Sequence, residues 1–160
     1  MTIEKVVEHR RLGTGGALKN ALSRYPCDEF MAVNGDNTFS NHDWINTFIR
    51  DWQESDQLRI MVATAESGKD YGAVKINTSC QISEFQEKGI DQRVFISSGH
   101  YLMKRELLDL VNKEEFSLEH DIFEEFTKQG KLIPASFCRD AFLDFGSPDK
   151  VEKSLMLMGE

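Results

Sequence analysis

The glycine-rich segment GTGG at residues 13–16 lies between a strand-like segment and a helix-like segment. This unit of strand, glycine segment and helix most constrains the fold. The β-branched content of Thr2 to Val7 predicts a strand, and the apolar spacing of residues 17–22 predicts a helix. The N–H groups of such a loop at a helix start can approach a nucleotide closely. A tight turn that requires positive φ explains the same glycines, so the loop alone does not decide the function.

Strands and helices continue to alternate along the rest of the chain. Short apolar runs predict strands at residues 30–34, 58–65, 94–103, 132–137 and 142–145. Helical spacing predicts helices at residues 44–52, 104–111 and 118–129, with a last helix after Ser147. The stretch from Gly72 to Glu87 alternates and turns near Asn77, which predicts a β-hairpin. We therefore expect an α/β fold, with a mostly parallel sheet, helices on both faces and an antiparallel hairpin.

The length and charge of the chain exclude several classes of protein. Its 160 residues suit a single domain, residues 1–160, with one core. No apolar run approaches the roughly 20 residues of a membrane span, and the N-terminus does not resemble a secretory signal, so we expect a cytoplasmic protein. A net charge of -8 disfavours a nucleic-acid surface, which needs clustered Lys and Arg. Anionic small substrates would need local positive charge or a divalent cation.

Two acidic residues follow apolar runs at distant points of the chain. Asp36 ends the segment VNGD directly after the predicted strand 30–34, and Asp144 lies in LDFGSP, before a glycine turn. Carboxylates suit a hard cation such as Mg²⁺, and ligands of α/β sheets bind beyond the carboxyl ends of the strands. Two separate turn or cap roles are the alternative to one shared magnesium ion. The four histidines show no metal-ligand spacing, so surface or capping roles are expected for them.

A series of short motifs runs in order over nearly the whole chain. They are Glu8 with LGTGGAL at 12–18, VNGD at 33–36, YGAV at 71–74, F-x-EK at 85–88, ISSGHYL at 96–102, FSLEHDIF at 116–123 and FLDFGSP at 142–148. In this order they resemble the sugar-phosphate nucleotidyltransferases, most closely guanylyltransferases acting on D-glycero-D-manno-heptose 1-phosphate or mannose 1-phosphate. The resemblance implies a Rossmann-like fold and transfer of a nucleotidyl group from an NTP to a sugar 1-phosphate, with release of pyrophosphate.

The resemblance also implies a role for residues in these motifs. The nucleotide would be bound by Glu8, Leu12, Gly13, Thr14 and Gly35. The sugar would be bound by Gly72, Glu87, Ser97 and Gly99. Asp36 and Asp144 would bind Mg²⁺, and Lys88 would face the sugar phosphate as the third expected catalytic group. Because ionised Glu8 only accepts hydrogen bonds, it suits the two adjacent N–H groups of guanine and favours GTP, although the single N–H of uracil also fits.

The chain departs from the family pattern at two places. The family begins with a strand and a glycine-rich loop that carries an Arg, followed by a Pro-Lys-Pro segment, and this chain lacks both the loop and the segment. In the family, the missing strands lie in the middle of the sheet. We therefore expect an N-terminally incomplete domain with an open apolar edge, which a homo-oligomer or a complementing chain would cover. Ser97 stands where the family usually has Asn, which leaves the sugar undetermined. The alternative function is a non-catalytic remnant that binds nucleotide sugar or pairs with a full-length homologue.

Overall fold

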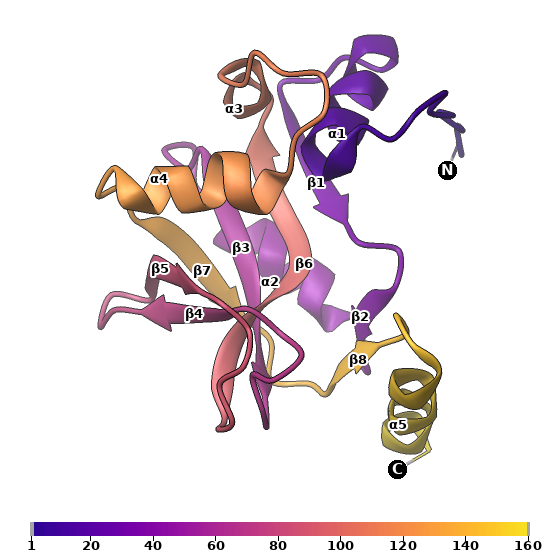
Figure 1. Ribbon diagram of the computed structural model, residues 1–160, viewed down its shortest axis with the longest axis vertical. Coiled ribbons are helices and arrows are strands. Elements are labelled where there is room, and N and C mark those ends of the chain that lie inside the picture. The colour runs from indigo at the N-terminus through magenta and orange to yellow at the C-terminus, as the bar shows by residue number, and fades with distance from the viewer. Residues whose placement is uncertain (1, 160) are drawn as a thin grey trace.

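The chain folds into a twisted sheet flanked by helices, with a small two-stranded ribbon beside it (Figure 1). The computed structural model describes residues 2–159. Its strands are β1 (Glu29–Val33), β2 (Asn37–Phe39), β3 (Leu58–Ala65), β4 (Ala73–Ile76), β5 (Gln81–Gln86), β6 (Val94–Lys104), β7 (Ile133–Phe137) and β8 (Phe142–Asp144). Its helices are α1 (Gly13–Arg24), α2 (Asp43–Asp51), α3 (Glu106–Asp109), the π-helical segment η1 (Glu119–Glu124), α4 (Glu125–Lys128) and α5 (Pro148–Met158). None of the helices between residues 2 and 159 combines the length and apolar character needed to cross a membrane.

The six-stranded sheet has the order β1-β6-β3-β7-β5-β4, and its strand directions differ in part from the prediction. Strands β1, β3, β4 and β7 run in the same direction, whereas β5 and β6 run in the opposite one. Because β6 lies between β1 and β3 and is antiparallel to both, β3 and β7 form the only parallel ladder among the described strands. The predicted hairpin is confirmed as β4 and β5. The expectation of a mostly parallel sheet is wrong, because the neighbouring strands pair mostly in the antiparallel direction.

Helices cover both faces of the sheet, as expected, and β3 shows how the core is divided between them. Its side chains alternate, so that Ile60 and Val62 pack in the cluster that includes residues of α1, α3 and η1. Met61 and Ala63 point to the other face and pack with Trp44 and Phe48 of α2. Figure 1 shows α4 in front of the sheet and α2 behind it. A strand buried on both faces explains the continuous apolar run that predicted β3.

The segment Thr2 to Val7, predicted to be a strand, has no regular secondary structure. Its side chains are largely in solvent, with Ile3 81% and Val7 51% exposed. A strand requires a neighbour for its backbone N–H and C=O groups, and none of the described strands lies beside this segment. Among the described strands β1 pairs with β6 alone, so the sheet has an open edge at β1.

The ribbon of β2 and β8 was not predicted as a pair. It is short and antiparallel, with Asn37 opposite Asp144 and the buried Phe39 opposite Phe142. Phe39 packs edge-on against Phe142 and close to Trp44, which ties the ribbon to α2. The ribbon is important for the site because it brings the end of β1 next to the end of β8.

Candidate active site

The two predicted acidic residues, Asp36 and Asp144, lie close together. The backbone N–H of Phe145 donates a hydrogen bond of 2.8 Å to the carbonyl oxygen of Asp36, next to the β2–β8 pairing. A Cβ atom added to Gly146 would lie 3.1 Å from Asp144 Oδ1 and 3.2 Å from Asp36 Oδ2. The two carboxylate oxygens can therefore be no farther apart than the sum of these distances. Only a glycine leaves the space between them open.

Asp144 is held by three donors of the protein. Tyr71 Oη and Lys150 Nζ lie 2.7 Å and 2.8 Å from Asp144 Oδ2, and the Gly146 N–H donates to Oδ1 at 2.8 Å. Burial raises the pKa of Asp144, but hydrogen bonds from Lys150, Gly146 and Tyr71 outweigh it and hold the pKa below its usual value. Burial and Asp144 together raise the pKa of Tyr71. Asp144 is thus ionised, and Tyr71 neutral, at physiological pH.

Two carboxylates are a suitable ligand set for one divalent cation shared with a substrate. Magnesium in nucleotide enzymes is commonly held by one or two carboxylates together with substrate phosphates and water. The region from residue 2 to residue 159 contains no group of three or more His, Cys, Asp or Glu side chains placed to bind a metal. The paired Asp36 and Asp144 fit such a shared site, in which the substrate supplies further oxygen ligands.

A pocket of about 350 Å³ contains the residues expected to bind the sugar. Its walls include Gly72, Glu87, Ser97, Gly99 and Lys88. The sequence did not identify several other polar residues that line it, which are Asn34, Asn37, Tyr71, Gln86, Tyr101, Glu119, His120 and Glu124. Most of these stand in or beside the quoted motifs, so motif position was the available signal. The pocket adjoins the acidic pair, because Tyr71 also binds Asp144.

Three of the lining residues have side chains free to meet a ligand. Ser97 Oγ is buried and has no hydrogen-bond partner within the described chain. Neither Glu87 nor Lys88 forms an ion pair with another residue of the described region. A buried hydroxyl without a partner costs free energy, about 1–3 kcal/mol, which a ligand hydroxyl would recover.

Gly99 has a structural role as well as a place in the pocket. A Cβ there would lie 2.6 Å from Asn34 Nδ2, and the Asn34 N–H donates to the Gly99 carbonyl at 2.9 Å. Gly99 therefore lets β6 approach the end of β1, which places Asn34 in the pocket wall. Gly35, by contrast, has open space where a side chain would project.

Most of the residues expected to bind the nucleotide lie at the start of α1, whereas Gly35 lies beyond the end of β1. The Leu12 N–H donates to Glu8 Oε2 at 3.2 Å, which fixes Glu8 beside Gly13. The Thr14 hydroxyl donates to Glu119 and accepts from the Leu118 N–H, so only its backbone remains for a ligand.

The packing of the first turn of α1 also explains two of its glycines. The Gly15 N–H donates to the Phe116 carbonyl at 3.0 Å, and a Cβ on Gly15 would lie 2.1 Å from the Phe116 ring. A Cβ on Gly16 would lie 2.2 Å from the Glu114 carbonyl oxygen. Gly15 and Gly16 are therefore required for close packing of α1 on residues 114–116.

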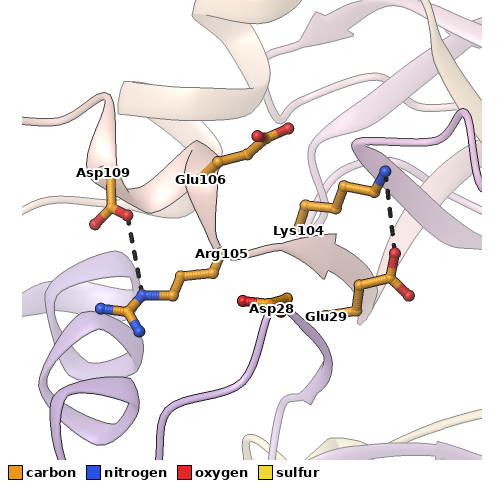
Figure 2. A pocket seen from close by; sticks show the side chains of 6 residues that line it. All are labelled: Asp28, Glu29, Lys104, Arg105, Glu106 and Asp109. Carbon is orange, nitrogen blue, oxygen red and sulfur yellow. Dashed lines mark ion pairs between the residues drawn. The ribbon is translucent and has the colours of Figure 1, made fainter.

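A second hollow, of about 470 Å³, is lined by six charged residues: Asp28, Glu29, Lys104, Arg105, Glu106 and Asp109 (Figure 2). Its charged side chains are largely matched with one another. Lys104 Nζ lies 4.0 Å from Glu29 Oε1, and Arg105 Nε lies 3.9 Å from Asp109 Oδ2. It contains no residue of the predicted site, and its cations are already neutralised.

Comparison with known proteins identifies the family. Residues 1–158 match the family model described as nucleotidyl transferase. This chain belongs to the nucleotidyl transferase family. The chain is 30% identical over 156 residues to a D-glycero-alpha-D-manno-heptose 1-phosphate guanylyltransferase from Aneurinibacillus thermoaerophilus, covering 96% of this chain and 66% of the relative. It is 27% identical over 158 residues to a mannose-1-phosphate guanylyltransferase from Mycobacterium tuberculosis, covering 93% of this chain and 42% of that protein.

A solved structure agrees with the fold described above. The chain superposes on HddC from Yersinia pseudotuberculosis, crystallised with GMP-PN, with a TM-score of 0.78 and 27% sequence identity. The match covers 94% of this chain and 64% of that structure. The predicted α/β nucleotide-diphospho-sugar transferase fold and the family resemblance are thus confirmed. This nucleotidyl transferase spans just under two thirds of the length of the heptose 1-phosphate relative.

Proposed function

We propose that this chain provides the guanine-binding, metal-binding and sugar-binding parts of a sugar-1-phosphate guanylyltransferase. The reaction is transfer of GMP from GTP to a heptose or mannose 1-phosphate, which gives a GDP-sugar and pyrophosphate. The observation that carries the proposal is the close pair Asp36 and Asp144 beside a pocket whose polar groups suit sugar hydroxyls. The names of the heptose 1-phosphate and mannose 1-phosphate relatives support the substrate class.

Each part of the site has a chemical task in this reaction. Glu8, at the start of α1, would accept hydrogen bonds from guanine next to the backbone of Gly13 and Thr14. Glu87 and Ser97 would bind sugar hydroxyls, and Lys88 would bind the sugar phosphate. Asp36 and Asp144 would hold a magnesium ion, whose positive charge would offset the repulsion between the negatively charged substrates.

The bond changes require positioning rather than a covalent intermediate. A phosphate oxygen of the sugar 1-phosphate attacks the α-phosphorus of GTP in line. The bond from that phosphorus to the β-phosphate oxygen breaks, and pyrophosphate leaves with the electron pair. Lys88 would orient the attacking phosphate, while the hydroxyl contacts of Glu87 and Ser97 hold the ring in place.

Pyrophosphate release provides the test of this function. The assay contains GTP, Mg²⁺ and either heptose 1-phosphate or mannose 1-phosphate. We expect turnover that the substitution Asp36→Asn abolishes, because an amide is a poor ligand for magnesium. The matched control Asp109→Asn removes an exposed acid of the second hollow and should retain wild-type turnover. Equal activity of wild-type protein and Asp36→Asn would contradict the proposed role of Asp36.

A binding or complementing role is the second candidate, and the open edge of β1 favours it. β1 has one ladder partner among the described strands, and Val33 on it is 48% exposed. An open, partly apolar edge is a site for strand addition by another chain. In this case the chain alone would bind GDP-sugar saturably without turnover. It would form a complex with a full-length relative, such as the Aneurinibacillus protein, that size-exclusion chromatography with light scattering detects.

A further inference from the structure

The π-helical segment η1 forms one wall of the sugar pocket and presents an unusual set of polar side chains. Glu119, His120 and Glu124 all line the pocket. An α-helix aligns residues three or four apart, whereas the i→i+5 bonding of a π-helix brings residues five apart onto one face. Glu119 and Glu124 are five residues apart, so the π-helical winding places both carboxylates toward the pocket, with His120 beside them.

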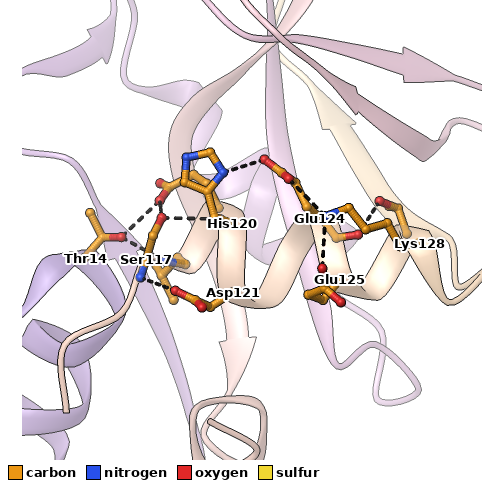
Figure 3. A network of polar contacts seen from close by, with 10 residues as sticks. Thr14, Ser117, His120, Asp121, Glu124, Glu125 and Lys128 are labelled. Atoms are coloured by element: carbon orange, nitrogen blue, oxygen red, sulfur yellow. Dashed lines mark hydrogen bonds and ion pairs between the residues drawn. The ribbon is translucent and has the colours of Figure 1, made fainter. Parts of the chain in front are cut away.

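The hydrogen bonds of η1 distinguish residues held within the protein from one, His120, that can bind a ligand (Figure 3). Glu119 uses both oxygens within the protein, since Thr14 donates to Oε2 at 3.0 Å and Tyr101 donates to Oε1 at 3.2 Å. His120 Nδ1 lies 2.6 Å from Glu124 Oε1. His120 Nε2 has no hydrogen-bond partner in the described part of the chain, and the imidazole is largely exposed. Glu124 therefore orients the ring, and His120 offers its second nitrogen to the pocket.

The position of η1 relative to the acidic pair decides which part of a sugar it faces. Tyr101, the partner of Glu119, lies opposite Ala32 in the β1–β6 ladder. Asp36 lies beyond the end of β1, so η1 is set back along β1 from the acids. A sugar whose C1 phosphate faces Asp36 and Asp144 would turn its C4 side and the exocyclic chain on C5 toward η1.

We propose that His120, oriented by Glu124, binds hydroxyl groups of the exocyclic chain and thereby selects a heptose over mannose. This inference rests on the proposed function and names the substrate that the site prefers. A heptose carries one more hydroxyl-bearing carbon in that chain than mannose does. An imidazole nitrogen at the exposed mouth of the pocket can bond this additional group, whereas the ring hydroxyls remain for the buried Ser97 hydroxyl and for Glu87.

Isothermal titration of the purified chain with two ligands tests the inference. The ligands are GDP-D-glycero-D-manno-heptose and GDP-mannose, each in the presence of Mg²⁺. We expect wild-type protein to bind the heptose compound more tightly, and His120→Ala to weaken its binding about tenfold, the effect of one lost hydrogen bond to a ligand. His120→Ala should leave GDP-mannose binding within twofold of wild type. His120→Gln, which keeps a polar group, should recover part of the lost affinity for the heptose compound. Glu124→Ala should lower this affinity by less than His120→Ala does.

The control is Lys128→Ala, which removes an exposed partner of Glu124 outside the pocket and should leave the preference unchanged. Thermal denaturation of each variant separates loss of binding from loss of folding. Equal weakening of both ligands by His120→Ala, or no weakening of either, would overturn the role of His120 while leaving guanylyl transfer in place. Failure of wild-type protein to bind either GDP-sugar would instead contradict the proposed function and, with it, the inference.

Discussion

The substitution Gly146→Ala tests the geometry of the acidic pair. The added methyl group would lie 3.1 Å from Asp144 Oδ1 and 3.2 Å from Asp36 Oδ2, closer than ordinary carbon–oxygen contacts. The two carboxylates would have to move apart by a few tenths of an ångström, and the methyl group would occupy the space between them. Magnesium and manganese tolerate little distortion, since their oxygen ligands lie at about 2.0–2.2 Å. We expect the affinity for the cation to fall about tenfold, or about 1.4 kcal/mol.

Electron paramagnetic resonance with Mn²⁺ measures this loss directly, because bound and free Mn²⁺ give different signals. The free energy of unfolding should change by less than about 1 kcal/mol, since Gly146 is exposed and its φ is not left-handed. Gly35→Ala is the geometric control, because nothing lies within 4 Å of the added Cβ although Gly35 adjoins Asp36. Unchanged Mn²⁺ affinity in Gly146→Ala, with the protein folded, would refute the shared cation site.

Two further substitutions test the packing of the first turn of α1 and the environment of Asp144. Gly15→Ala places a methyl group 2.1 Å from the Phe116 ring and should lower the free energy of unfolding in urea by about 2–3 kcal/mol; an unchanged midpoint would contradict this packing. Lys150→Met removes a donor that lowers the pKa of Asp144. A carboxyl group whose pKa is lowered by folding stabilises the fold at pH values above its unfolded pKa of about 3.9, and this stabilisation is lost as the pH falls through the folded pKa. The variant should therefore be about 1 kcal/mol less stable than wild type at pH 7 and as stable as wild type near pH 2.

Features encoded in local sequence could be predicted. The strand at 58–65 is apolar at nearly every position because both of its faces are buried, and its bounds match β3. Asp36 and Asp144 were predicted as shared magnesium ligands because the motifs VNGD and FLDFGSP resemble those of the family, and the structure places the two acids together. Their roles as metal ligands, and those of the nucleotide-binding and sugar-binding residues, stay predictions.

Features that depend on contacts between distant segments could not be predicted from the local sequence. Thr2 to Val7 has the composition of a strand, but strand formation depends on a neighbour that local composition does not encode. The antiparallel direction of β6 likewise depends on where the chain re-enters the sheet. Lys150 lies near Asp144 because α5 turns back on β8, and Glu119 reaches Thr14 from 105 residues away. The π-helical winding of η1 had no signal in the apolar spacing, which predicted one continuous helix.

A crystal soaked with GDP-D-glycero-D-manno-heptose and Mn²⁺ would test the central claim most directly. Anomalous scattering locates the manganese without reference to the bound sugar nucleotide. The account predicts one manganese peak between the carboxylates of Asp36 and Asp144, at about 2.2 Å from an oxygen of each, with the sugar beside Ser97 and guanine beside Glu8. A nucleotide sugar bound elsewhere, or a manganese peak that neither carboxylate contacts, would contradict it.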